Sequence, residues 1–85
     1  MKQFKFVIKD ENGIHARPAG LLVKKAGEFS SSVMIQKGEK SADAKRLFAV
    51  MGLAAKKNDE LTFTIDGEDE EQALSALQQF CDENL

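Results

Sequence analysis

The sequence of 85 residues lacks a disulfide framework, a long apolar run and an excess of basic residues. Its single cysteine, Cys81, cannot form an internal disulfide, and small domains without disulfides are typical of the reducing cytoplasm. No segment approaches the roughly 20 apolar residues of a membrane span, and the N-terminal residues lack the apolar core and cleavage site of a signal peptide. The formal net charge of −2 argues against a nucleic-acid partner. We therefore expect a cytoplasmic protein with no membrane insertion.

The sequence also lacks internal repeats, low-complexity tracts and linkers rich in Pro, Gly or Ser. A chain of this length suits one compact domain, so we expect residues 1–85 to form a single domain and to remain monomeric. Such a domain buries only about 60% of the surface that its unfolded chain exposes. We therefore expect no large enclosed substrate cavity, and any chemistry should take place at the surface.

Hydrophobic periodicity divides the chain into seven elements in the order β-α-β-β-α-β-α. The pattern predicts strands over residues 2–8, around 33–35, over 40–44 and over 61–65, and helices over 16–27, over 47–53 and from 70 onward. Strands that are apolar on one face need a cover on that face only. The expected fold is therefore α+β, an open-faced β-sandwich with a four-stranded antiparallel sheet covered on one face by three helices.

Helix signals make these expectations more specific. Gly27 is expected to be a C-cap, and Asp69 with Gln72 is expected to form a capping box for the last helix. In the short helix, the spacing of Leu47, Val50 and Leu53 predicts a buried stripe. Cys81 is expected to be a small core residue of the last helix.

The one histidine, His15, stands immediately before the first helix, in the segment Gly13-Ile14-His15-Ala16-Arg17-Pro18-Ala19. A helix N-terminus offers unpaired amides and the positive end of the macrodipole, which together favour an anion such as phosphate. Pro18 suits the first turn because its missing donor is not needed there. Arg17 adds a guanidinium suited to phosphoryl oxygens.

These features predict a nucleophilic histidine beside an oxyanion cradle. The alternative is that His15 only caps the helix, which a lone surface histidine does more often than it takes part in chemistry. The spacing alone favours the functional interpretation by a small margin.

The whole chain resembles the HPr family, the histidine-containing phosphocarriers of the bacterial phosphoenolpyruvate-dependent sugar phosphotransferase system. The resemblance is carried by the segment around His15 and by Lys24, Phe29, Met51-Gly52-Leu53 and Gly67-Glu68-Asp69-Glu70. It implies that phosphorylated enzyme I transfers a phosphoryl group to Nδ1 of His15 and that an enzyme IIA domain then accepts it. It also implies an active-site role for Arg17 and phosphate binding by the amides of Ala16 and Arg17. The protein would then be a carrier without a cofactor or metal, not a turnover enzyme.

The same resemblance implies that partner proteins dock on the first two helices. Phe48 and Met51 lie off the expected buried stripe at i, i+3 spacing, and Gly20 and Leu21 lie off the stripe of the first helix. Without the resemblance, Phe48 and Met51 would be assigned to the core. With it, the residues expected to contact partners are Gly20, Leu21, Lys24, Leu47, Phe48, Met51 and Gly52.

Arg46 is a departure from the HPr pattern. Many HPr proteins carry a regulatory serine before the short helix, whereas this chain has Arg46 there. We therefore expect no phosphorylation by the HPr serine kinase.

Two other functions are compatible with the fold. A regulatory HPr-like module would bind partners without moving phosphate, but such proteins lack the histidine or use the serine. A carrier in a nitrogen-related or otherwise dedicated phosphorelay differs only in its partner proteins. The identity of the acceptor would distinguish that relay from sugar transport.

Overall fold

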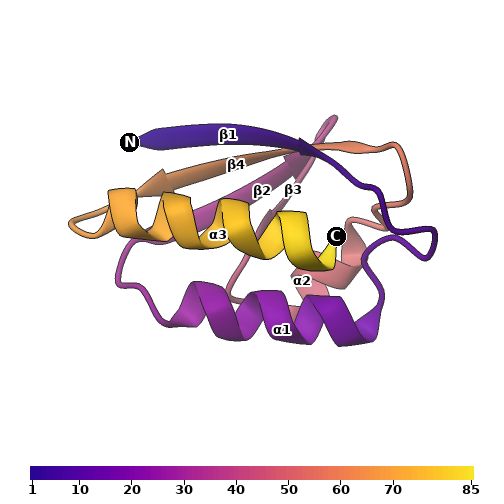
Figure 1. The fold of residues 1–85 in the computed structure, drawn as a ribbon, viewed down its shortest axis with the longest axis horizontal. Coiled ribbons are helices and arrows are strands. Elements are labelled where there is room, and N and C mark those ends of the chain that lie inside the picture. The colour runs from indigo at the N-terminus through magenta and orange to yellow at the C-terminus, as the bar shows by residue number, and fades with distance from the viewer.

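The computed structural model describes residues 1–85 and has the expected order of elements (Figure 1). The strands are β1 (Lys2–Val7), β2 (Ser32–Lys37), β3 (Lys40–Asp43) and β4 (Glu60–Asp66). The helices are α1 (Ala16–Gly27), α2 (Leu47–Gly52) and α3 (Glu70–Asn84). None of these helices is long and apolar enough to cross a lipid bilayer.

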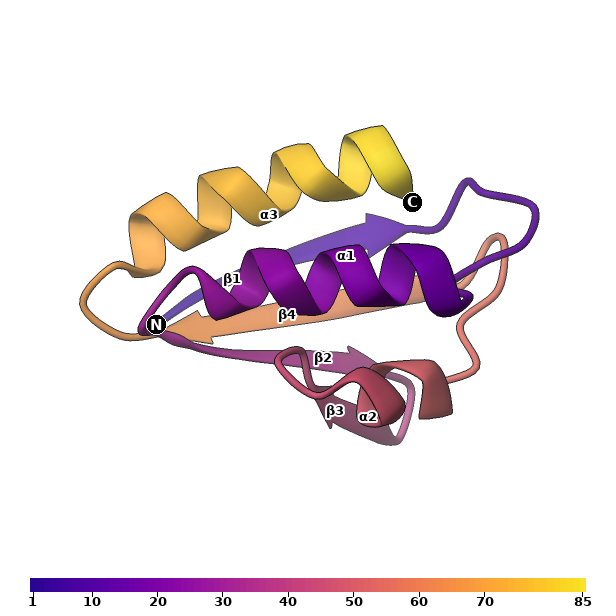
Figure 2. The same cartoon turned by 90° about the horizontal axis from the view of Figure 1, so that it is seen from below.

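The four strands form one antiparallel sheet in the order β1-β4-β2-β3. All three helices lie on the same face of this sheet, with α1 and α3 running along the strands (Figure 2). The opposite face carries polar side chains such as Gln3, Lys5 and Gln36, which are exposed. The expected open-faced β-sandwich is therefore confirmed.

The core lies between the sheet and the helices because each strand alternates apolar and polar residues. In β4, Leu61, Phe63 and Ile65 are fully buried, and Phe63 pairs in register with Phe4 of β1 and Ile35 of β2. The rings of Phe4 and Phe63 stack with their centroids 4.6 Å apart. A single cluster of 20 buried hydrophobic residues joins the sheet to all three helices.

Neither α1 nor α2 ends with a glycine in the left-handed region, which differs from the expectation for α1. Gly27 is the last residue of α1 and has no positive φ, and the helix closes through the right-handed Glu28, so the expected glycine C-cap is wrong. After α2, the positive φ occurs at Ala54, two residues beyond Gly52. In both helices the final turn satisfies its carbonyls through short-range amide bonds, which removes the need for a glycine in the left-handed region.

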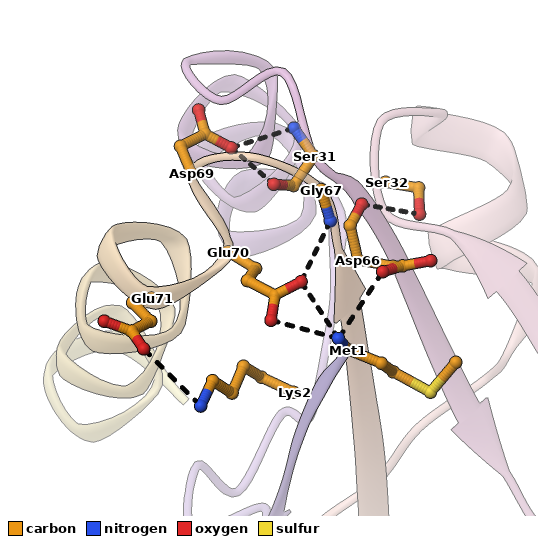
Figure 3. A network of polar contacts seen from close by, with 9 residues as sticks. All are labelled: Met1, Lys2, Ser31, Ser32, Asp66, Gly67, Asp69, Glu70 and Glu71. Atoms are coloured by element: carbon orange, nitrogen blue, oxygen red, sulfur yellow. Dashed lines mark hydrogen bonds and ion pairs between the residues drawn. The ribbon is translucent and has the colours of Figure 1, made fainter.

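The expected capping box at α3 is also wrong. Asp69 is the N-cap residue, but its carboxylate makes no capping bond to the helix. It accepts a hydrogen bond from the amide of Ser30 at 2.9 Å. It also accepts hydrogen bonds from the amide of Ser31, at 3.0 Å, and from the hydroxyl of Ser31 (Figure 3). The carboxylate thus binds the loop between α1 and β2 and not the first turn of its own helix.

Glu70 completes this junction at the start of α3. Its carboxylate accepts the amide of Gly67 at 3.1 Å and the ammonium group of Met1 at 3.0 Å (Figure 3). We call the contacts of Asp69 and Glu70 the α3 junction. It fastens the starts of β1 and α3 to the loop before β2, and it lies at the end of the molecule opposite the start of α1 (Figures 1 and 2).

Candidate functional site

The loop between β1 and α1 positions His15. Gly13 has φ +63°, and a Cβ atom there would lie 2.2 Å from the carbonyl oxygen of Ala55. The next residue, Ile14, is buried and donates its amide to that same oxygen at 3.0 Å. The close approach of two backbones therefore fixes the segment directly before His15, and only glycine fits at position 13.

His15 is the N-cap residue of α1, with extended backbone angles of φ −101° and ψ −173°. Its side chain makes no capping hydrogen bond and the residue is exposed. His15 is therefore the N-cap residue by position, but its imidazole does not cap the helix. The imidazole is available to a partner in solution.

The first turn of α1 leaves two amides without a backbone partner. Pro18 has no N–H, and the amide of Ala19 donates to the carbonyl oxygen of His15 at 3.0 Å. The amides of Ala16 and Arg17 remain, and both residues are exposed beside the imidazole. The first turn contains no acidic residue, so nothing there opposes the positive end of the helix dipole.

A shallow cavity of about 250 Å³ lies beside the imidazole. Its lining contains His15, Arg17, Pro18 and Leu21 from the α1 region, together with Asp10, Glu83 and Asn84. The structure thus brings His15 and Arg17 to one surface hollow. The α3 residues in the lining were not foreseen, because they stand near the other end of the sequence and only the folded chain places them beside His15.

Backbone contacts at Leu85 hold the end of α3 near this hollow. Leu85 is buried, and its carbonyl oxygen accepts the amides of Lys9 and Asp10 at 2.7 and 2.8 Å. The one signal for this contact in the sequence is a large apolar residue that follows the polar last turn of the predicted helix. The rim of the hollow therefore combines Arg17 with two carboxylates, those of Asp10 and Glu83.

Exposed apolar side chains occur on α1 and α2, which contact each other. Phe48 is 84% exposed, Leu21 43% and Leu47 37%. Gly20, Lys24 and Gly52 are exposed as well, so the surface can be reached by another protein. We call Leu21, Leu47 and Phe48 the apolar patch.

Two residues of α2 differ from the expectations. Leu47 was expected in the buried stripe, but it is the first residue of the helix and is exposed, while Val50 and Leu53 are buried. Met51 was expected to be exposed beside Phe48, but it is half-buried and packs against the core. A six-residue helix on a small core buries more than one narrow stripe.

Cys81 is fully buried in α3, as expected. Burial raises the pKa of its thiol to about 12, so the reactive thiolate is suppressed at neutral pH. Packing alone explains the presence of this cysteine.

The fold and this site define a class of small open-faced β-sandwich proteins that present one exposed histidine at the start of their first helix. The family model described as the PTS HPr component phosphorylation site matches residues 2–83. The chain belongs to the HPr family of phosphocarrier proteins.

Individual relatives agree with this assignment. The phosphocarrier protein HPr of Lysinibacillus sphaericus is 47% identical over 77 residues, which cover 91% of this chain and 88% of the relative. The crystal structure of HPr-C-His from Thermoanaerobacter tengcongensis has a TM-score of 0.93 at 34% identity and covers 99% of this chain and 94% of its own. The dimer of Crh, the Bacillus subtilis catabolite repression protein with a swapped domain, has a TM-score of 0.78 at 36% identity and covers 100% and 98%.

Proposed function

We propose that this protein accepts a phosphoryl group on His15 from phosphorylated enzyme I and donates it to enzyme IIA domains, which use it for sugar uptake. The phosphoryl group would originate from phosphoenolpyruvate. The observation that carries the proposal is the exposed imidazole of His15, free of capping bonds, beside Arg17 and the two unpaired amides of α1. The protein acts as a stoichiometric carrier in the cytoplasm, where its free buried thiol is stable.

The transfer needs only one nucleophilic atom of this chain. The lone pair of His15 Nδ1 forms a bond to phosphorus while the bond from phosphorus to the donor breaks, and the leaving atom of the donor keeps that electron pair. The ring proton stays on Nε2. In the second transfer the acceptor attacks, the P–N bond breaks and its electron pair returns to Nδ1. Both steps conserve charge and atoms without a cofactor.

Three features beside His15 favour the phosphorylated state through electrostatics, and they act against the two carboxylates of Asp10 and Glu83 on the rim of the hollow. The amides of Ala16 and Arg17 supply hydrogen bonds to phosphoryl oxygens, and the guanidinium of Arg17 supplies a charge-assisted contact. The positive end of the α1 dipole adds to both. Because the hollow is shallow and open, the phosphoryl group stays accessible to the next protein.

The apolar patch would provide the docking surface for both partners. A donor and an acceptor must each approach His15 in turn, so one shared surface next to the imidazole is the simplest arrangement. Gly20, Lys24, Met51 and Gly52 lie on the same two helices as the patch and would complete the contact. Transfer to several partners through one surface requires contacts that adapt, which side chains such as Met51 allow.

The test is an intact-mass measurement after incubation with phosphoenolpyruvate, Mg²⁺ and enzyme I. We expect an adduct with the mass of one phosphoryl group, labile in acid, that is absent from His15→Ala. Arg17→Ala should still be modified, but more slowly by about 10²-fold, the typical effect of removing one donor to a developing anion. Arg17→Lys controls for the loss of positive charge.

The acceptor is identified by adding enzyme IIA domains to the phosphorylated protein. Transfer to a sugar-specific enzyme IIA supports the proposal, whereas transfer only to a nitrogen-related enzyme IIA indicates a dedicated relay. No adduct with an active enzyme I would overturn the carrier role and favour a regulatory binding module.

A further inference from the structure

Residues 54–59, which connect α2 to β4, lie beside the connection from β1 to α1 (Figures 1 and 2). We call that second connection, residues 8–15, the His15 loop. Two backbone hydrogen bonds join the connections where β1 ends. The amide of Asn58 donates to the carbonyl oxygen of Ile8 at 2.8 Å, and the amide of Ile8 donates to the carbonyl oxygen of Asp59 at 3.0 Å. Residues 54–59 therefore hold the start of the His15 loop.

The same segment also holds the other end of the His15 loop. The carbonyl oxygen of Ala55 accepts the amide of Ile14 at 3.0 Å and lies against Gly13. Ile14 directly precedes His15, so a shift of Ala55 would shift the imidazole. The position of His15 therefore depends on the conformation of residues 54–59.

Two residues of this segment have a positive φ. Ala54 has φ +52° and Asn58 has φ +77°, both in the left-handed region. Asn adopts this region more readily than Ala, whose Cβ atom comes close to the backbone there. An unfavourable conformation of this kind persists only where the surrounding structure fixes it. Contacts from outside the segment are therefore needed to hold Ala54.

The side chains of Lys37 and Asp59 supply contacts of this kind. Lys37 is the last residue of β2, and its Nζ donates to the carbonyl oxygen of Ala54 at 3.2 Å and lies 3.5 Å from Oδ2 of Asp59. The same Oδ2 accepts the amide of Lys56 at 2.9 Å. The amide of Lys56 lowers the pKa of the Asp59 carboxyl, and the ammonium group of Lys37 lowers it further, so the carboxylate is charged at neutral pH. We call these three contacts the Lys37 clasp.

We propose that Lys37 and Asp59 are positioning residues for phosphoryl transfer, because their clasp holds residues 54–59 and this segment holds both ends of the His15 loop. The inference rests on the proposed carrier function. Neither residue lines the hollow beside the imidazole, so neither would touch the phosphoryl group. A single ion pair that solvent reaches contributes little to stability. A reacting atom displaced by about 1 Å, in contrast, can slow a reaction by about 10²-fold.

The experiment measures enzyme I-dependent phosphorylation of Lys37→Met and Asp59→Asn, together with the NMR resonances of the His15 ring. Lys37→Met keeps the length of the side chain but removes its charge and its donors. We expect kcat to fall by about 3- to 10-fold in both variants with KM nearly unchanged, since the docking residues are intact, and the ring resonances to shift. Lys37→Arg keeps a cation with donors and should restore most of the rate.

Two control variants separate position from stability and from charge. Asp69→Asn removes a charged contact at the α3 junction, at the opposite end of the molecule, and reports the effect of lost stability alone. Lys40→Met removes an exposed cation of β3 that makes no ion pair, and it reports the effect of lost charge alone. Both controls should leave kcat and the His15 resonances unchanged.

Three results would overturn the proposal. A less stable Lys37→Met with unchanged kcat and unchanged His15 resonances shows that the clasp only stabilises the fold. A raised KM with kcat unchanged shows that the clasp acts through partner docking. Absence of phosphorylation of the unchanged protein removes the carrier function on which this role depends, and that result differs from normal phosphorylation of both variants. Asp59→Asn keeps an acceptor for the amide of Lys56, so it tests the proposal even where Lys37→Met does not fold.

Discussion

His15 occupies a helix position at which Ser, Thr, Asp and Asn are strongly preferred. Its imidazole makes no bond to the first-turn amides, so α1 begins without the roughly 1 kcal/mol that a good N-cap contributes. The amides left unpaired are those that would bind phosphoryl oxygens. The unpaired amides of the first turn therefore explain both the missing stabilisation of α1 and the proposed binding of phosphoryl oxygens.

Replacing His15 by a residue that caps well should separate these two properties. We expect His15→Asn to raise the free energy of unfolding by about 0.5–1 kcal/mol, because the amide oxygen can accept from the first turn, and to abolish phosphorylation. Urea unfolding and intact mass measure the two effects. His15→Ala is the control, since it removes the imidazole without adding a cap. A His15→Asn protein less stable than His15→Ala would contradict this account of the N-cap.

Gly13 is the residue whose replacement should disturb the site most without altering its chemistry. Alanine at position 13 would need a left-handed backbone and would place its Cβ 2.2 Å from the oxygen of Ala55. We expect Gly13→Ala to destabilise the fold by about 1–3 kcal/mol, the usual cost of such backbone strain, and to slow phosphorylation by moving His15. Urea unfolding and phosphorylation rates of the same sample measure both effects.

Gly27→Ala is the matched control for Gly13→Ala. Gly27 has no positive φ, and a Cβ atom there meets no atom within 4 Å. Because alanine favours the helix over glycine, the control should be neutral or more stable by up to about 1 kcal/mol. Equal destabilisation by both substitutions would show that the loop before His15 tolerates a side chain.

Among the secondary-structure elements, α3 depends on a carboxylate at its start. The hydroxyl of Ser31, followed by the amides of Ser30 and Ser31, stabilises the charged form of Asp69 and lowers its pKa from 3.8 to about 2. A lowered pKa in the folded state means that the unfolded state binds the proton more readily. The stabilising contribution of Asp69 is therefore present above pH 3.8 and is lost as the pH falls toward 2.

Asp69→Asn should accordingly destabilise the fold at pH 7 and make little difference at the lowest pH. The amide keeps one acceptor oxygen but loses the charge that three donors stabilise. Thermal unfolding of both proteins from pH 2 to 7 should give curves that converge below pH 3.8. Asp82→Asn, at an exposed position on the same helix whose side chain has no hydrogen-bonding partner, should instead leave the stability at pH 7 close to that of the unchanged protein. A constant difference across the pH range would show that Asp69 acts through packing alone.

The sequence predicted the helices and strands correctly where hydrophobic periodicity alone determines them. Leu61, Phe63 and Ile65 alternate strictly, and β4 is a strand that pairs with two neighbours. The predictions were wrong where a distant segment competes with a local one. Asp69 and Gln72 have the spacing of a capping box, but the amides of Ser30 and Ser31 arrive from 38 or more positions away and take the carboxylate. The spacing of residues within the helix does not reveal donors that come from a distant segment.

At the scale of the whole molecule, the sequence predicted only the part of the site whose residues lie in one continuous segment. His15, Arg17 and the helix amides lie in one short segment, so the predicted start of the helix was enough to show that they are close together. The opposite rim, formed by Asp10, Glu83 and Asn84, depends on where α3 ends relative to β1. Similarly, the half-burial of Met51 depends on how a six-residue helix sits on the core, which no local pattern specifies.

The two ends of the molecule should respond independently to substitution. The loop before His15 and the α3 junction lie at opposite ends of a fold whose longest dimension is 33 Å, and they share no hydrogen-bonding partner. We expect the destabilisations of Gly13→Ala and Asp69→Asn at pH 7 to add within about 0.5 kcal/mol in the double variant.

Gly13→Ala and His15→Asn should not add, because a displaced loop removes the geometry that lets an asparagine at position 15 cap α1, so most of the gain from the cap disappears. Urea unfolding of the two double variants and their parents measures both coupling energies. Strong coupling between Gly13 and Asp69 would mean that the single core transmits a shift from one end of the sheet to the other, and that changes at the α3 junction reach His15.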